Sequence, residues 1–127
     1  MARDKSAERR TRRVARHRRV LKKIRGTAER PRLVVFRSLK NIEGQLVDDD
    51  RGATLLGIST LTVDASDTKD VENMSGKVAA SYVAGHRLAE KAREEGIDRI
   101  VFDRGGYRFH GRVRAFAEGA RAGGLEF

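Results

Sequence analysis

Arginine side chains crowd the first 25 residues of this 127-residue chain, and their chemistry suits phosphate groups. A guanidinium group is a planar fork of N–H donors that meets two phosphate oxygens at once, and this segment holds nine Arg against three Lys. Such a density favours a polyanionic partner over a run of merely solvated charge. The predicted contacts are Arg9, Arg10, Arg12, Arg13, Arg16, His17, Arg18, Arg19, Lys22, Lys23 and Arg25.

A glycine-rich stretch, residues 103–112, is the second candidate for phosphate chemistry. It lies between a predicted strand and a predicted helix, where backbone amides favour phosphate and aromatic rings could stack on unpaired bases. An alternative remains open, in which Tyr107 or Phe109 fills the core and the glycines only make a tight turn. The candidate contacts are Arg104, Tyr107, Arg108, His110 and Arg112.

The third candidate is the short segment 37–41, which joins two predicted strands. Its basic and polar residues, Arg37, Ser38, Lys40 and Asn41, could contact phosphates and 2′-hydroxyl groups. A plain hairpin turn would be equally well formed from these residues. This segment alone is therefore weak evidence.

Enzyme chemistry finds little support in the sequence. Neither of the glycine patterns typical of nucleotide-binding loops is present, and the chain has no cysteine. The three histidines, His17, His86 and His110, do not fall at the spacing of metal ligands. We therefore predict a non-catalytic protein with no cofactor, no metal and no small-molecule substrate.

The basic charge belongs to one end of the chain. The net charge is +10, yet residues 1–40 hold 16 Lys and Arg against three acidic residues, a net of +13. The remaining 87 residues hold 12 basic and 15 acidic side chains, a net of −3. No apolar run approaches the roughly 20 residues of a membrane-spanning helix, and the first residues resemble neither a secretory signal nor a Ser-rich transit segment. We expect a cytoplasmic protein without a membrane partner.

Two regions must position these side chains. Residues 1–25 form a basic arm in which Val14, His17, Leu21 and Ile24 recur at helical spacing, although repulsion between like charges four residues apart opposes the helix. We predict that the arm is flexible when free, or helical on binding. Residues 26–127 form the folded domain, which begins near Pro31.

The domain pattern predicts an α/β fold. Strands are expected at 33–36, 42–48 and 53–61, and a polar loop at 62–73. A long amphipathic helix follows from Met74 to a stop at Gly96, then a strand at 97–102 and a helix closed by Gly123 and Gly124. The expected fold is a mixed sheet of about four strands (three-strand antiparallel meander, helix, strand, helix) with helices packed on it, preceded by the basic arm.

Several motifs, taken in order, resemble one known family. They are the basic arm, Arg30–Ser38 (RPRLVVFRS), Val101–Tyr107 (VFDRGGY), His110–Val113 (HGRV) and Gly123–Phe127 (GGLEF). Together they resemble bacterial large-subunit ribosomal protein eighteen, the family that binds 5S ribosomal RNA. The similarity runs over nearly the whole chain. One departure is the stretch Leu39–Glu43, where the aromatic residue usual in relatives is replaced by Glu43.

The resemblance implies a structural component of the large ribosomal subunit, located in the cytoplasm within the ribosome. It further implies that the protein binds 5S ribosomal RNA and helps attach it to 23S ribosomal RNA in the central protuberance, beside other 5S-binding proteins. The implied RNA contacts are the arm, Arg32, Arg37, Ser38 and Lys40, and Arg104, Tyr107, Arg108, His110 and Arg112. Two other functions remain as alternatives: an architectural DNA-associated protein, and a small enzyme using residues 103–112 as a phosphate site.

Overall fold

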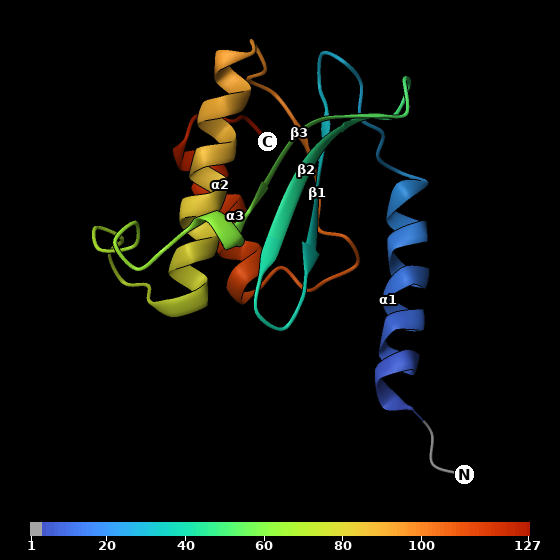
Figure 1. Cartoon of the computed structure of the whole chain (residues 1–127). Helices are drawn as coiled ribbons and strands as arrows, with labels where there is room; N and C mark the ends of the chain where they lie inside the picture. Colours follow the sequence, from blue (N-terminus) through green and yellow to red (C-terminus); the bar gives the residue numbers. More distant parts are fainter. Residues whose placement is uncertain (1–3) are drawn as a thin grey trace.

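A computed structural model describes residues 4–127 as a basic helix beside a small α/β body (Figure 1). The elements in order are α1 (Lys5–Leu21), β1 (Arg32–Arg37), β2 (Ile42–Asp48), β3 (Ala53–Ser59), the 3₁₀ helix η1 (Thr60–Thr62), α2 (Gly76–Glu94), β4 (Val101–Asp103) and α3 (Gly111–Ala122). The order of strands and helices predicted for the domain is confirmed. The helix inside the arm spans most of it, and whether it forms only on binding stays a prediction.

The sheet is mixed, in the strand order β3-β2-β1-β4. β1 pairs antiparallel with β2, and β2 with β3, which is the predicted meander. β4 pairs parallel with β1, with Val34 opposite Asp103. Because parallel neighbours need a crossover, α2 carries the chain from β3 over the sheet to β4.

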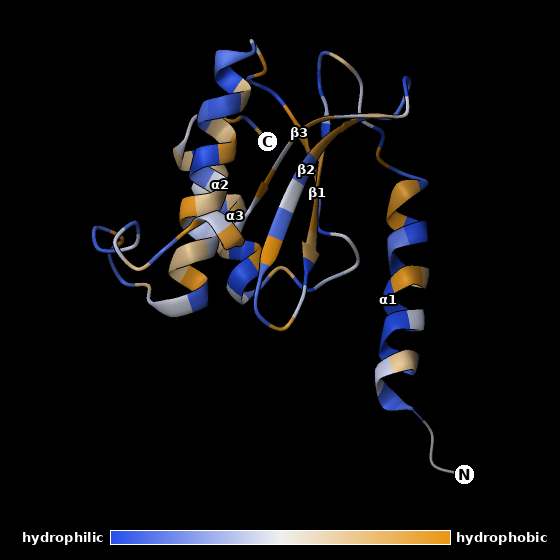
Figure 2. Cartoon of the chain, viewed as in Figure 1, coloured by the Kyte–Doolittle hydropathy of each residue, from blue (hydrophilic) through white to orange (hydrophobic). Residues whose placement is uncertain are grey.

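α2 and α3 cover one face of the sheet and form the core with it (Figure 1). Along β2 the buried residues Ile42, Gly44 and Leu46 alternate with more exposed ones, so one face of the strand turns inward. Phe116 of α3 is fully buried, and a Cβ on Gly44 would overlap its ring. Figure 2 shows the apolar residues gathered on the strands and on α2, whereas α1 is mostly hydrophilic with separate apolar bands.

The two helices of the core pack backbone against backbone. A Cβ on Gly85 of α2 would overlap the carbonyl oxygen of Phe116, and a Cβ on Gly119 of α3 would overlap the carbonyl oxygen of Tyr82. Glycine at these positions therefore sets the distance between α2 and α3.

Replacing Gly85 with Ala should destabilise the chain by about 1 to 3 kcal/mol, because the added methyl group overpacks the contact between the helices. In an exposed helix the same change usually stabilises. Urea unfolding measures the effect. Gly57→Ala is the matched control, because its nearest neighbour would lie at 3.8 Å and its backbone is unstrained. Equal stability of the two variants would contradict the close packing.

Some predicted boundaries were wrong. The third strand ends at Ser59 rather than Leu61, because the buried Thr60 turns the chain into η1 and its hydroxyl accepts a hydrogen bond from the Ile42 amide (3.0 Å). β4 covers only 101–103, because Ile97 still bonds back to the end of α2 and Ile100 bonds to Glu126 near the C-terminus. Asp103 is therefore a strand residue rather than the start of the glycine-rich loop.

No helix among residues 4–127 is both long and apolar enough to cross a membrane.

Candidate nucleic-acid interface

α1 runs along the face of the sheet that α2 and α3 leave uncovered (Figure 1), and polar contacts hold it there. None of its residues is buried. Nε2 of His17 lies 2.7 Å from Oδ2 of Asp103, and Nε of Arg16 donates to the carbonyl oxygen of Gly106 (3.1 Å). The guanidinium carbon of Arg13 lies 4.7 Å from the centre of the Tyr107 ring, a cation–π contact. The helix is thus attached by side chains rather than by a shared core.

Gly106 permits this close approach. Its φ is +80°, and a Cβ there would lie 2.5 Å from the carbonyl oxygen of Arg13. The sequence suggests that the glycines of this loop approach phosphate or make a tight turn. In the structure, Gly106 makes room for the backbone of α1.

A chain of charged groups continues inward from His17. The side chain of Asp103 is fully buried, and its Oδ2 accepts a hydrogen bond from Nη1 of Arg32 (2.7 Å). The other donors of Arg32 bind Asp49, with Nε to Oδ2 at 2.9 Å and Nη2 to Oδ1 at 3.0 Å. Asp49 also accepts from the Gly26 amide (2.7 Å), which fixes the start of the linker behind α1. The motif-based prediction placed Arg32 against RNA, but its donors are used within the chain.

This network shifts the pKa of the Arg32 guanidinium group and of the Asp49 carboxyl group. The hydrogen bond from Arg32 holds the pKa of Asp49 below its ordinary value of 3.8, although partial burial opposes the shift. The hydrogen bond to Asp49 likewise raises the pKa of Arg32, so both groups stay charged in the folded chain.

Asp49 should therefore make stability fall in acid. Its pKa is lower in the folded chain than in the unfolded one, so the unfolded state takes up the proton first as the pH falls. The contribution is complete above the unfolded pKa of about 4 and disappears as the pH drops through the folded pKa. We expect Asp49→Asn to be less stable than the parent at neutral pH and to approach it toward about pH 3 in urea unfolding. A stability difference that is constant with pH would contradict this pair.

Seven cations, five on α1 and two directly after it, have no partner among residues 4–127. All seven of the following are exposed and form no hydrogen bond or ion pair with any described residue: Arg9, Arg10, Arg12, Arg18, Arg19, Lys22 and Lys23. Arg25 differs, because it pairs with the exposed Asp50 at 2.7 Å. The helix therefore presents a row of cations to solvent, as the predicted phosphate-binding role requires.

In the glycine-rich loop the structure separates the aromatic from the basic residues. Tyr107 is buried, and its hydroxyl donates to the carbonyl oxygen of Arg37 (3.2 Å) and accepts from the Arg37 amide (3.1 Å). The core alternative thus describes Tyr107. Phe109 is 42% exposed and packs edge-on against Phe102. Within this loop, the exposed side chains that make no hydrogen bond or ion pair with residues 4–127 are Arg104, Arg108 and His110.

The hairpin segment 38–41 meets this loop. The Ser38 amide donates to the carbonyl oxygen of Asn41 (2.8 Å), which closes the turn, and Lys40 points outward without a described partner. Nη1 of Arg112 donates to the carbonyl oxygen of Ser38 (2.7 Å). Burial, and then repulsion from Arg37, lower the pKa of Arg112, which shows how closely these cations lie. Two segments predicted as separate contacts therefore form one basic surface.

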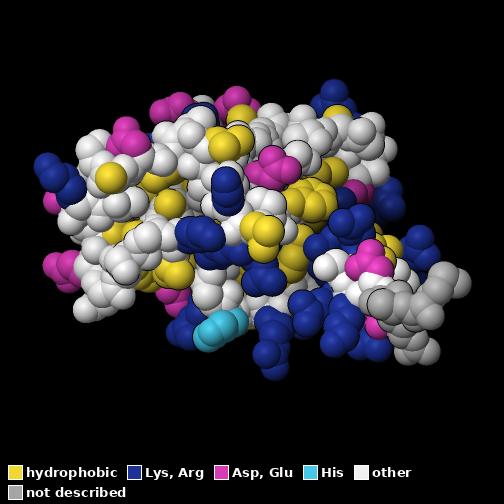
Figure 3. All heavy atoms as spheres, turned by 60° about the horizontal axis from the view of Figure 1, so that its bottom comes forward, with side chains coloured by type: hydrophobic (Ala, Val, Ile, Leu, Met, Phe, Trp, Pro, Cys, Tyr) yellow, Lys and Arg dark blue, Asp and Glu magenta, His cyan; other side chains and the backbone are white. Residues whose placement is uncertain are grey.

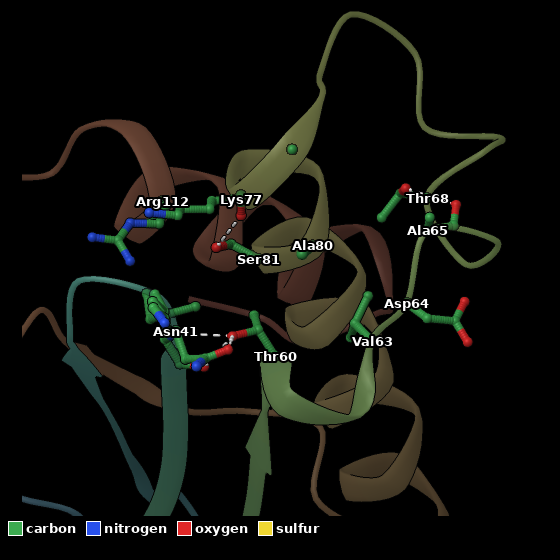
Figure 4. Close-up of a pocket in the computed structure, with 13 residues that line it drawn as sticks. Asn41, Thr60, Val63, Asp64, Ala65, Thr68, Lys77, Ala80, Ser81 and Arg112 are labelled. Carbon is green, nitrogen blue, oxygen red and sulfur yellow. Dashed lines mark hydrogen bonds between the residues drawn. The ribbon is translucent and has the colours of Figure 1, made fainter.

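A hollow of about 440 Å³ extends this surface toward the start of α2 (Figure 4). Lys77 and Arg112 lie on one side of it and Asp64 on the other, with the Asn41–Thr60 hydrogen bond at its base. Nζ of Lys77 donates to the carbonyl oxygen of Leu39 (2.7 Å). Sequence reasoning places Lys77 only on the polar side of a helix, so this cation was missed.

Figure 3 looks onto the lower end of the molecule in Figure 1 and shows that Lys and Arg side chains gather on one part of this face, with apolar side chains between them. Sequence reasoning also missed Asp103 and Asp49, the carboxylates that position α1. An acidic residue two positions before a pair of glycines was the available signal for Asp103. Among the described residues, no group of three His, Asp or Glu side chains is placed to hold a metal ion.

The opposite side of the molecule is acidic. Asp67, Asp70, Glu72 and Glu90 line a hollow of about 590 Å³ between the loop before α2 and α2 itself. Arg87 pairs with Asp67 at 2.7 Å, which leaves most of this charge negative. In Figure 1 this loop lies across the sheet from α1.

Comparison with known proteins decides the family. The family model described as ribosomal L18 of archaea, bacteria, mitochondria and chloroplast matches residues 7–127. The chain belongs to the ribosomal L18 family. A large ribosomal subunit protein uL18 from Pelotomaculum thermopropionicum is 58% identical over 97% of this chain and 98% of its own length. Proteins of the same name from Caldicellulosiruptor saccharolyticus and Thermotoga neapolitana are each 48% identical over 97% of this chain, and over 97% and 98% of their own lengths.

Membership of the ribosomal L18 family confirms the resemblance seen in the motifs. The chain is a structural constituent of the large ribosomal subunit, located in the cytoplasmic ribosome. Ribosomal RNA and other ribosomal proteins are its partners, and the family is structural rather than enzymatic. The DNA-associated and enzymatic alternatives are thereby set aside.

Proposed function

We propose that this ribosomal L18 protein binds 5S ribosomal RNA and helps attach it to 23S ribosomal RNA in the central protuberance, beside other 5S-binding proteins. The observation that carries the proposal is the group of seven cations on α1 and just after it that have no partner among residues 4–127, continued by the basic loops at 37–41 and 104–112. The choice of 5S RNA rests on the resemblance of the motifs to their family.

Residues of the basic surface would divide into two roles. The contacts to RNA are the exposed side chains of α1 and Arg25, with Arg37, Ser38, Lys40, Asn41, Arg104, Arg108, His110 and Arg112. His17, Arg32 and Tyr107 act by holding α1 and the loops in place, because their polar groups already have partners in the chain. Arg13 and Arg16 belong to both sets, since each touches the domain and retains donors.

A binding assay with competitors tests this proposal. The chain should bind 5S ribosomal RNA with an affinity that falls steeply with salt. Unlabelled 5S RNA should displace labelled 5S RNA from the chain. It should do so at a much lower nucleotide concentration than duplex DNA or an unrelated structured RNA. Displacement by duplex DNA at an equal nucleotide concentration would contradict the proposal.

A further inference from the structure

A third hollow, of about 540 Å³, lies between α1 and the end of the sheet, on the face away from α2 and α3. We call it the arm hollow. Its side chains come from α1, β1, β2, η1 and the glycine-rich loop. The principal ones are Arg10, Arg13, Phe36, Arg37, Glu43 and Leu61, with Tyr107 behind them.

The arm hollow combines apolar surface with positive charge. Phe36 is 44% exposed and Leu61 is 76% exposed, so water covers a ring and a large aliphatic group there. Among residues 4–127, Arg10 has no partner, and the guanidinium group of Arg37 makes no hydrogen bond or ion pair and lies 5.1 Å from the centre of the Tyr107 ring. A flat ring beside unpaired guanidinium groups suits a ligand that is aromatic and anionic.

Glu43 adds selectivity to this surface. It pairs with Phe36 across the strands, so both side chains leave the same face of the sheet. Among residues 4–127 its carboxylate makes no hydrogen bond or ion pair. A carboxylate accepts from the exocyclic amino group of a base, whereas uracil flanks its single N–H with carbonyl oxygens that repel a carboxylate.

We infer that the arm hollow binds one unpaired nucleotide of the RNA, with a base that carries an amino group. The base stacks on Phe36, its amino group donates to Glu43, and its phosphates lie against Arg10 and Arg37. A hydrophobic side chain of a neighbouring protein would leave the arginines unused. The inference rests on the proposed function, because it names a nucleotide of the RNA that the chain binds.

The test uses the full chain with 5S ribosomal RNA and compares the parent with Phe36→Ala and Phe36→Leu. Phe36→Ala should weaken binding about 5- to 100-fold, and Phe36→Leu by less, because it keeps apolar volume without a ring. The salt dependence of binding should flatten by no more than the share of the phosphates at Arg10 and Arg37, because stacking itself releases no counterions. Met74→Ala is the control, since Met74 is a partly exposed apolar residue that lines the acidic hollow on the other side of the molecule and lies outside the arm hollow.

Chemical probing of Watson–Crick edges supplies the second readout. The parent should protect one unpaired adenine, cytosine or guanine, and Phe36→Ala and Glu43→Gln should expose it again. If the parent binds 5S RNA and the variants match it in affinity and footprint, no nucleotide occupies the arm hollow, which then suits a protein neighbour. That result overturns the inference and leaves the proposed function standing. A flattening of the salt dependence with Phe36→Ala beyond the share of the phosphates at Arg10 and Arg37 would also overturn it, because Phe36 would then act by holding α1. If the parent binds no 5S RNA, the proposed function and the inference that rests on it are both wrong.

Discussion

Replacing the seven unpartnered cations of α1 and of the two residues after it with Gln should lower the affinity for 5S ribosomal RNA by about a thousandfold at low salt. The changed residues are Arg9, Arg10, Arg12, Arg18, Arg19, Lys22 and Lys23, none of which has a described partner. For every phosphate that the variant no longer neutralises, the slope of log affinity against log salt should flatten by about 0.7 to 0.9. Gln keeps the helix propensity of Arg and Lys, so the change removes charge and leaves the helix in place.

A titration over several salt concentrations measures the slope directly. The control replaces Lys91, Arg93 and Arg99 with Gln, because these exposed cations lie at the other end of α2 and beyond it, away from the basic surface. The control should bind like the parent. An unchanged slope in the α1 variant would show that the helix does not contact phosphates.

Asp103→Ala should destabilise the folded chain by about 3 to 5 kcal/mol, the usual cost of removing one partner of a buried ion pair. The Asp103 carboxylate is fully buried and accepts hydrogen bonds from the Arg32 side chain and the Gly105 amide. Its Oδ2 also lies within hydrogen-bond distance of Nε2 of His17. Without it, the Arg32 side chain, which is only 11% exposed, keeps a single carboxylate partner. The buried cation then lacks compensation for its missing hydration.

Urea unfolding measures this cost, and Asp50→Asn is the control. Asp50 also pairs with an arginine, but the side chains of Asp50 and Arg25 are 55% and 66% exposed, so the pair contributes at most about 1 kcal/mol. Hydrogen exchange of α1 should quicken in the Asp103 variant and stay unchanged in the control, because only Asp103 anchors His17. Equal stability of the two variants would exclude a buried network.

Local patterns predicted the domain well, because strand alternation and helix periodicity are properties of neighbouring residues. The meander at 32–59 and the helix ending at Gly96 follow from such patterns, and Gly96 has the positive φ expected of a helix stop. The site was harder to predict. Arg32 and Asp103 are brought together by the parallel pairing of β1 with β4, which joins residues 71 positions apart and leaves no periodic signal.

Residue type alone did not settle the role of a side chain that suits both base stacking and core packing. Tyr107 has the chemistry of a base-stacking residue, yet its hydroxyl closes a pair of hydrogen bonds on the Arg37 backbone. The segments at 37–41 and 104–112 were predicted as two loops far apart in the chain, and the contacts of Arg112 with Ser38 and of Tyr107 with Arg37 show that they form one surface. The exposed cations of α1 were predictable, because no fold could bury so many of them.

The acidic loop across the sheet from α1 affects how fast the protein finds its partner. Positive charge at one side of the molecule and negative charge at the other make it an electric dipole. In the field of a polyanion such a dipole turns its basic side forward before contact, so fewer encounters occur in the wrong orientation. The acidic residues therefore favour the orientation in which the basic surface, which they never touch, meets the RNA.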